Sequence, residues 1–78
     1  MKVWTLKVND WDDTNKEYKR RYTKILSSSV KARREAVQYI TLVKNCKGVK
    51  TDEHSKTFYA VSAKDMSAHC VITEVTVG

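Results

Sequence analysis

Proline is absent from the chain of 78 residues, and glycine occurs only at positions 48 and 78. The sequence therefore has no glycine-rich loop of the kind that cradles phosphates, and Asp, Asn and Ser must form most of its turns. No apolar run approaches the roughly 20 residues that a membrane-spanning helix needs, and Met1–Val8 lacks the long apolar core of a secretory signal. We therefore expect a cytoplasmic protein that does not enter a membrane.

Cysteine is scarce as well, because the chain has only Cys46 and Cys70. They can form one disulfide at most, and a cytoplasmic chain is expected to keep both as free thiols. Together with His54 and His69 they are the right elements for zinc, but neither Cys46 nor His54 has a partner at the short spacing of structural zinc sites. His69 and Cys70 point to opposite faces if a strand begins there. The sequence predicts no metal and no cofactor.

The sequence also lacks a recognisable catalytic set, since no nucleophile, base and orienting group come together in a motif. The paired carboxylates Asp12–Asp13 and Asp52–Glu53 lie in segments with ordinary turn composition. A domain of this length has little volume for a substrate pocket. Zinc-finger, homeodomain and RNP-type signatures are absent too. We predict a non-enzymatic binding protein without a small-molecule substrate.

What the chain has in excess is positive charge, with a net charge of +6 and a pI near 9.5. Between Lys16 and Arg34 the only acid is Glu17, and the cations there are Lys16, Lys19, Arg20, Arg21, Lys24, Lys31, Arg33 and Arg34. A basic surface of this kind attracts polyanions or acidic protein surfaces. The expected partners are therefore nucleic acid or an acidic protein surface, with the oligomeric state left open.

Hydrophobic periodicity predicts one small domain, residues 1–78, with the order ββαββ. Met1–Val8 alternates as a half-buried strand, and Asn9–Asn15 has the composition of a hairpin loop. Lys16–Ser27 fits a second strand, although Thr14 to Glu17 also matches a capping box that would start a helix there. Ser29–Asn45 follows the helical period, with an apolar stripe that comprises Val30, Ala32, Ala36, Val37, Tyr39, Ile40 and Val43. Thr57–Ser62 and Cys70–Val77 predict a closing hairpin.

This order predicts an α+β fold in which one helix packs on one face of a four-stranded antiparallel sheet. Ile40 and Val43 should be buried, and Lys31, Arg34 and Gln38 exposed. The side chains expected beneath the helix are Trp4, Leu6, Val8, Tyr22, Leu26, Tyr59, Val61, Val71, Val75 and Val77. The side chains expected on the open face are Thr5, Lys7, Lys19, Arg21, Thr23, Phe58, Ala60, Ile72, Glu74 and Thr76.

Two anion-binding surfaces are candidates. The open sheet face would present Lys7, Lys19 and Arg21 beside Phe58, as in sheet-based single-strand binders, but any uncovered antiparallel face is polar. At the helix start, Ser28, Ser29 and the first amides can hold an anion beneath Lys31, Arg33 or Arg34. The plainer interpretation is that these arginines are solvated or paired with acids. Arg20 and Lys24 complete the predicted basic surface.

The sequence favours a small basic nucleic-acid-binding accessory protein in which Tyr18 or Phe58 stacks on a base. The alternative is a protein interaction module, such as an inhibitor or adaptor that docks on an acidic or nucleic-acid-binding surface of a larger complex. Trp11 discriminates between them, because a tryptophan exposed among Asp10, Asp12 and Asp13 suits a protein interface better than phosphate. The short, lysine-rich chain suggests an accessory protein of the kind that phages and mobile elements encode.

Overall fold

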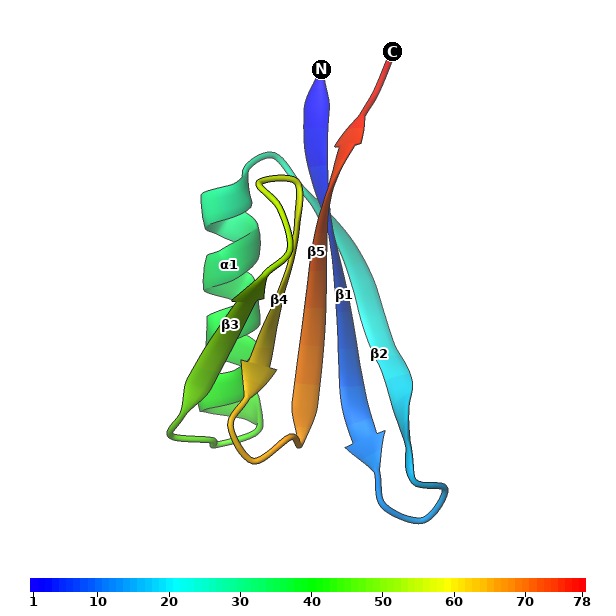
Figure 1. Cartoon of the computed structure of the whole chain (residues 1–78), viewed down its shortest axis with the longest axis vertical. Coiled ribbons are helices and arrows are strands. Elements are labelled where there is room, and N and C mark those ends of the chain that lie inside the picture. Colours follow the sequence, from blue (N-terminus) through cyan, green and yellow to red (C-terminus); the bar gives the residue numbers. More distant parts are fainter.

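The computed structural model describes all residues from Met1 to Gly78. The elements follow the order ββαβββ (Figure 1). They are β1 (Lys2–Asp12), β2 (Glu17–Leu26), α1 (Ser29–Gln38), the π-helical turn η1 (Tyr39–Val43), β3 (Val49–Glu53), β4 (Phe58–Ala63) and β5 (Ala68–Thr76). No helix has the length and apolar character needed to cross a membrane.

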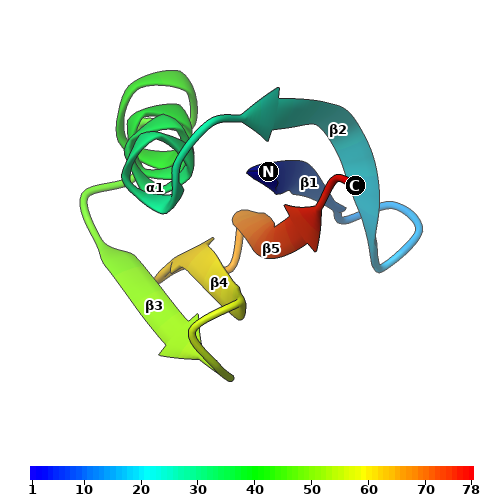
Figure 2. The ribbon, with the colours of Figure 1, turned by 90° about the horizontal axis from the view of Figure 1, so that it is seen from above.

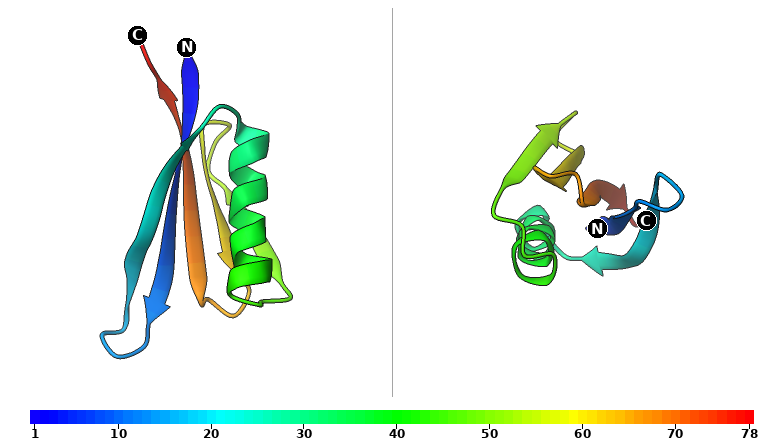
Figure 3. Two further views of the ribbon diagram at one scale, coloured as in Figure 1. Left: turned by 180° about the vertical axis from the view of Figure 1, so that it is seen from behind. Right: turned by 90° about the horizontal axis from the view of Figure 1, so that it is seen from below.

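The strands form one antiparallel sheet in the order β2-β1-β5-β4-β3. α1 connects the two edge strands, β2 and β3, and lies along one face of the sheet (Figures 1 and 3). Seen from above, the strands follow an arc whose concave side faces the helix (Figure 2). The expected packing of one helix on one face of an antiparallel sheet is therefore confirmed, and the other face carries no helix.

The sheet has five strands, so the prediction of four was wrong. The additional strand is β3, which lies between the predicted helix and the predicted closing hairpin, where we predicted no strand. Its sequence, Val-Lys-Thr-Asp-Glu, offers one apolar side chain, and its last four residues are exposed. It gives no alternating signal because it is an edge strand whose side chains meet little of the core.

The first hairpin is longer than predicted, since β1 continues through Asp10 and Trp11 to Asp12. The turn is built around the Asp12 carboxylate, which accepts hydrogen bonds from the backbone N–H of Thr14 at 3.0 Å and from Asn15 Nδ2 at 2.8 Å. Lys16 then takes a left-handed conformation with φ of 55°. β2 follows as a strand, so the strand interpretation of this segment is confirmed and the capping-box helix is not formed.

α1 begins where the serines predicted, because the Ser28 side chain accepts a hydrogen bond from the Lys31 backbone N–H at 3.1 Å. Its sheet-facing residues Ala32 and Ala36 are small, which lets the helix axis approach the strands closely. The helix packs on a core that comprises Leu6, Val8, Tyr39, Ile40, Tyr59, Val61, Ala63, Ala68, Cys70 and Ile72. Burial of each larger aliphatic side chain stabilises the fold by about 1.5–3 kcal/mol.

β5 presents the opposite set of side chains to the one predicted. Cys70 and Ile72 are fully buried beneath the helix, whereas Val75 and Val77 are exposed and Val71 lies on the open face. Both alternating sets of residues in this strand include apolar side chains, so alternation alone does not determine which set faces the helix. The pairing with β1 decides it, because Val8 lies opposite Cys70 and Leu6 opposite Ile72. Burial raises the pKa of the Cys70 thiol to about 12.

The C-terminal part of the predicted helix is not α-helical. From Tyr39 the chain forms η1, which keeps Tyr39 and Ile40 in the core and turns Val43 outward. The prediction of a buried Val43 was therefore wrong, as was the place of Val30 in the apolar stripe, because both side chains are exposed. The helical segment then ends as expected, and Asn45 adopts a left-handed conformation with φ of 52°.

Candidate nucleic-acid interface

A bulge in the first hairpin divides the basic residues of β2 between the two faces. Val8 pairs with Tyr22 but Asn9 pairs with Arg20, so Arg21 is an extra residue without a partner. A bulge of this kind reverses which alternate residues share a face. Arg20 and Tyr18 therefore lie on the open face, and the prediction that Lys19 and Arg21 lie there was wrong.

Most cations on the helix side are already paired with acids of the protein. Lys24 Nζ lies 2.9 Å from Glu35, and Lys19 Nζ lies 2.9 Å from Asp12. These hydrogen bonds raise the pKa of both lysines, and the one from Lys19 holds the pKa of Asp12 at about 2. Both lysines join elements within the fold, so neither is a free cation for a phosphate. Arg21 has no acidic partner.

The helix start uses its polar groups internally. Ser28 caps the helix, and the Ser29 hydroxyl lies 2.9 Å from the Tyr59 hydroxyl. Arg33 forms an ion pair with Glu53 at 3.2 Å, and its guanidinium lies over the Tyr59 ring, 4.8 Å from the centroid. Lys31 Nζ donates a hydrogen bond to Ser27.

Arg34 is the one arginine of the helix start without an acidic partner. An anion would have to displace several of these internal contacts to reach the helix start. The anion site predicted there remains a prediction, and its geometry favours a structural role for Ser28, Ser29 and Arg33.

The open sheet face has very little negative charge. By the register of the strands, Thr5, Lys7, Asn9 and Trp11 share this face with Tyr18, Arg20, Thr23, Ile25, Lys50, Asp52, Phe58, Ala60, Ser62, His69, Val71 and Thr73. Asp52 is the only carboxylate among them, and it lies 3.9 Å from Lys50. Ile72, Glu74 and Thr76, which we had placed on this face, lie on the helix side instead. The face therefore leaves Lys7 and Arg20 without an acidic neighbour.

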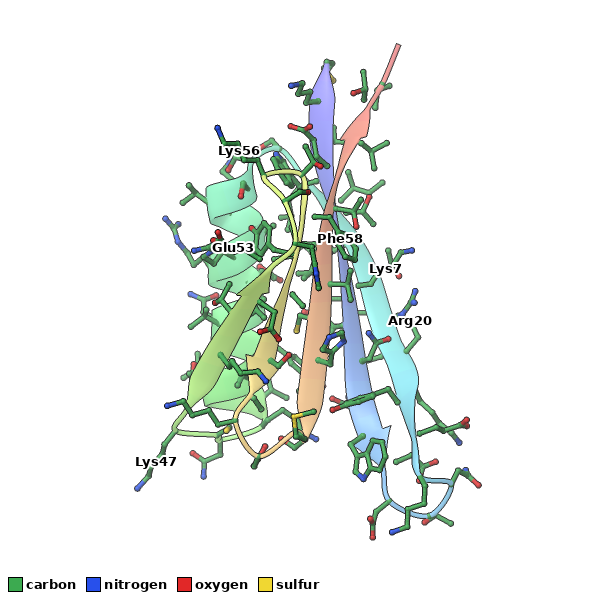
Figure 4. All side chains as sticks on the ribbon, viewed as in Figure 1. Lys7, Arg20, Lys47, Glu53, Lys56 and Phe58 are labelled. Carbon is green, nitrogen blue, oxygen red and sulfur yellow. The ribbon has the colours of Figure 1, made fainter.

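Arg20 is held in place by neutral groups. Its Nε donates to Asn9 Oδ1 at 2.8 Å and its Nη1 to the Thr23 hydroxyl at 3.2 Å. Asn9 is fixed in turn, because its Nδ2 donates to the His69 carbonyl at 3.1 Å. The guanidinium therefore keeps its full charge and a free Nη2 group. Figure 4 shows Arg20, Lys7 and Phe58 on the same side of the sheet.

Three aromatic rings lie next to Arg20 at one end of the face. The Tyr18 ring centroid is 5.1 Å from that of Trp11 and 5.6 Å from that of His69. The Tyr18 hydroxyl donates to the Met66 carbonyl at 2.8 Å, which fixes the central ring. Trp11 keeps 39% of its surface exposed, so it does not fold into the core. Phe58 supplies another exposed ring, 5.2 Å from that of His54.

The aspartates around Trp11 face away from it. Asp10 accepts a hydrogen bond from the Tyr39 hydroxyl at 2.6 Å on the helix side, while Asp12 and Asp13 pair with Lys19 and Lys16 around the turn. The objection that acidic neighbours make Trp11 unsuitable for phosphate is therefore weaker than the sequence indicated.

His69 and Asn9 are candidate site residues that sequence reasoning missed. His69 attracted attention only as a zinc ligand, and Asn9 as a turn former. They lie side by side with Arg20 across three neighbouring strands, because Asn9 on β1 pairs with Arg20 on β2 and with His69 on β5. A correct alternation through Trp11 would have placed Asn9 on this face, but no local signal identifies the bulge opposite it. No group of three or more His, Cys, Asp or Glu side chains is arranged to hold a metal ion.

Comparisons with protein-family models, with curated proteins and with solved structures find no match to this chain.

Proposed function

We propose that the protein binds single-stranded nucleic acid on its open sheet face. The observation that carries this proposal is a combination of charge and aromatic rings on one face. Lys7 and Arg20 are not paired with an acid, and the only carboxylate of the face is neutralised by Lys50. The same face carries the rings of Trp11, Tyr18 and His69. Unpaired cations bind phosphates and exposed rings stack on bases, which are the two components of single-strand binding.

The geometry favours single strands over duplexes. Bases in a duplex stack on each other and cannot reach aromatic side chains on a sheet, whereas bases of a single strand are free to do so. No helix lies on this face that could enter a major groove. Trp11 and Thr5 are six residues apart on β1, which corresponds to roughly 20 Å at a rise of about 3.4 Å per residue. Phe58 lies across the sheet from Thr5, at the same height along the strands. Several nucleotides fit within this span.

Arg20 and Lys7 would contact neighbouring phosphates, with Arg20 presenting its free Nη2 group. Trp11 and Tyr18 would stack a base at the end of the hairpin. Ala60 and Ser62 belong to this face but are buried by their neighbours, so they would contribute little contact. Such contacts are insensitive to sequence, so we expect weak base preference and strong dependence on salt.

The test is a fluorescence-anisotropy titration with labelled single-stranded DNA and RNA and with a duplex, each at two salt concentrations. Lys7→Ala and Arg20→Ala should each weaken single-strand binding and flatten the salt dependence by about 0.7 unit per lost phosphate contact. Trp11→Ala should weaken it by about 1–3 kcal/mol, and Trp11→Phe should restore most of that loss. Lys47→Ala removes an exposed charge from a loop off this face and is the matched control. If Lys7→Ala and Arg20→Ala behave like Lys47→Ala, the open face is not the interface.

A further inference from the structure

A second surface lies on the opposite side of the molecule, between β2 and the end of the helix. A pocket of about 240 Å³ is lined there by Tyr22, Glu35, Gln38, Tyr39, Leu42 and Val43. For comparison, an engineered protein cavity of about 150 Å³ accepts benzene. The pocket is therefore large enough for an apolar side chain.

The edge of this pocket is apolar and exposed. Leu42 is 74% exposed and Val43 is 64% exposed, although the helical period of the sequence places Val43 in the core. The π-helical turn η1 is what presents them to solvent. Such turns are rare and are found frequently at functional sites. The hydrogen bond from the Tyr39 hydroxyl to Asp10 anchors this turn to β1.

The free edge of the sheet runs beside the same pocket. β2 is an edge strand of ten residues, and no backbone hydrogen bond from a loop or another strand occupies its outer side. Its segment from Tyr22 to Leu26 pairs regularly with β1, beyond the bulge. β2 begins far from the helix and approaches it where the chain turns into α1 (Figure 3). A strand added to this edge would place alternate side chains on the same side as Tyr22, over the pocket.

Charge identifies the kind of strand that fits. Two arginines close to this lining in the sequence have no acidic partner: Arg21, the residue before Tyr22, and Arg34, one helical turn before Gln38. Glu35 is already neutralised by Lys24. A second copy of the chain is a poor occupant, since antiparallel pairing of two β2 edges brings Arg20, Arg21 and Lys24 against like charges.

We propose that β2 and this pocket bind an extended acidic segment of another protein as a sixth strand. An apolar side chain of the segment would enter the pocket between Tyr22, Leu42 and Val43. Carboxylates two positions away on either side would then lie on the same face of the added strand, next to Arg21 and Arg34. This surface is separate from the open sheet face and does not depend on nucleic-acid binding.

The test uses a short fluorescent peptide in which a leucine is flanked by glutamates two positions away on each side, with threonines between them. Titration of isotope-labelled protein should perturb the backbone amides of Tyr22–Leu26 and should slow their hydrogen exchange. Leu42→Asp should reduce affinity by about tenfold or more, which corresponds to about 1.4 kcal/mol. Arg34→Glu should weaken binding several-fold. Phe58→Ala, on the open face, is the control and should leave the affinity for this peptide unchanged.

Control peptides separate strand addition from simple charge attraction. A peptide with N-methyl groups on alternate residues cannot pair with an edge strand and should not bind, and neither should one with lysine in place of glutamate. Circular dichroism of each variant establishes that its fold is intact. Absence of binding, equal binding of the N-methylated peptide or an unchanged affinity in folded Leu42→Asp would each overturn the proposal. The proposal would also be overturned if sedimentation showed that the protein is a dimer and hydrogen exchange showed that the β2 amides are protected in that dimer.

Discussion

Replacing Tyr39 by phenylalanine tests how η1 is held on the sheet. The Tyr39 side chain is 6% exposed, and its hydroxyl donates to Asp10 Oδ1 at 2.6 Å. Lys44 Nζ lies 3.8 Å from the same carboxylate. The substitution Tyr39→Phe removes the hydroxyl and keeps the ring, which packs edge-on against Tyr22 at 5.9 Å. The change therefore isolates one charge-assisted hydrogen bond.

The expected loss follows from the surroundings of Asp10. A hydrogen bond to a charged group contributes about 1.5–3 kcal/mol to stability. Asp10 keeps Lys44 and remains partly open to water in Tyr39→Phe, so we expect a decrease of about 1–2 kcal/mol in the free energy of unfolding. For a domain of this size each kcal/mol shifts the melting temperature by roughly 4–8 °C, so the decrease should be about 5–15 °C. Thermal and urea unfolding followed by circular dichroism measure both quantities.

The pH dependence gives an independent test. Burial, followed by the hydrogen bond to Asp10, raises the pKa of Tyr39 above its ordinary value of 10.0. Above that pH the unfolded chain loses the phenol proton and the folded chain keeps it, so the wild-type protein loses stability as the pH rises. The slope is about 1.4 kcal/mol per pH unit for one such group. The difference in stability between wild type and Tyr39→Phe should therefore be largest below pH 10.0 and should shrink above it.

Tyr22→Phe is the matched control at neutral pH, because the Tyr22 hydroxyl makes no hydrogen bond within the protein while its ring lies against Tyr39. It should change stability by less than about 0.5 kcal/mol. Two results would refute this account of the turn. One is a Tyr39→Phe protein as stable as the wild type, and the other is a difference in stability between the two proteins that stays constant above pH 10.0.

Two further predictions concern the helix start and the thiols. Arg33→Ala should lower the melting temperature, because it removes the ion pair with Glu53 and the contact with the Tyr59 ring. Arg34→Ala should leave the melting temperature unchanged or slightly raised, since a cation near a helix N-terminus is unfavourable. Equal shifts of the two variants in thermal melts would contradict this assignment. In thiol titration of the native protein, half-buried Cys46 should react first. Cys70 should react only after unfolding, because burial raises its pKa to about 12. Fast reaction of both thiols would contradict this prediction and would show that the core opens readily.

Local sequence signals predicted the elements whose own residues carry them. The serines before α1 supply its cap, and the helical period from Ala32 to Ile40 predicts the buried face. The alternation of Leu6 and Val8 predicts the inner face of β1. These predictions are correct because a side chain in a regular element has its direction set by its position in that element.

Other features depend on neighbours distant in sequence. The extra residue at Arg21 changes the face of Lys19 and Arg20, and only the pairing of β2 with β1 reveals it. Val43 follows the helical period in the sequence, yet η1 turns it to solvent while the Tyr39 hydroxyl bonds to Asp10, a residue of β1.

The sequence by itself determined the fold class, the positions of the helix and of four strands, and the excess of positive charge. Only the tertiary structure decided the fifth strand, the face that β5 presents and the separation of the cations. Seven of the fifteen cations pair with acids, and of the eight that do not, Lys7 and Arg20 share the open face with the aromatic rings. The physical reason is that propensity and periodicity act within a few residues, whereas register and ion pairing depend on which strands become neighbours.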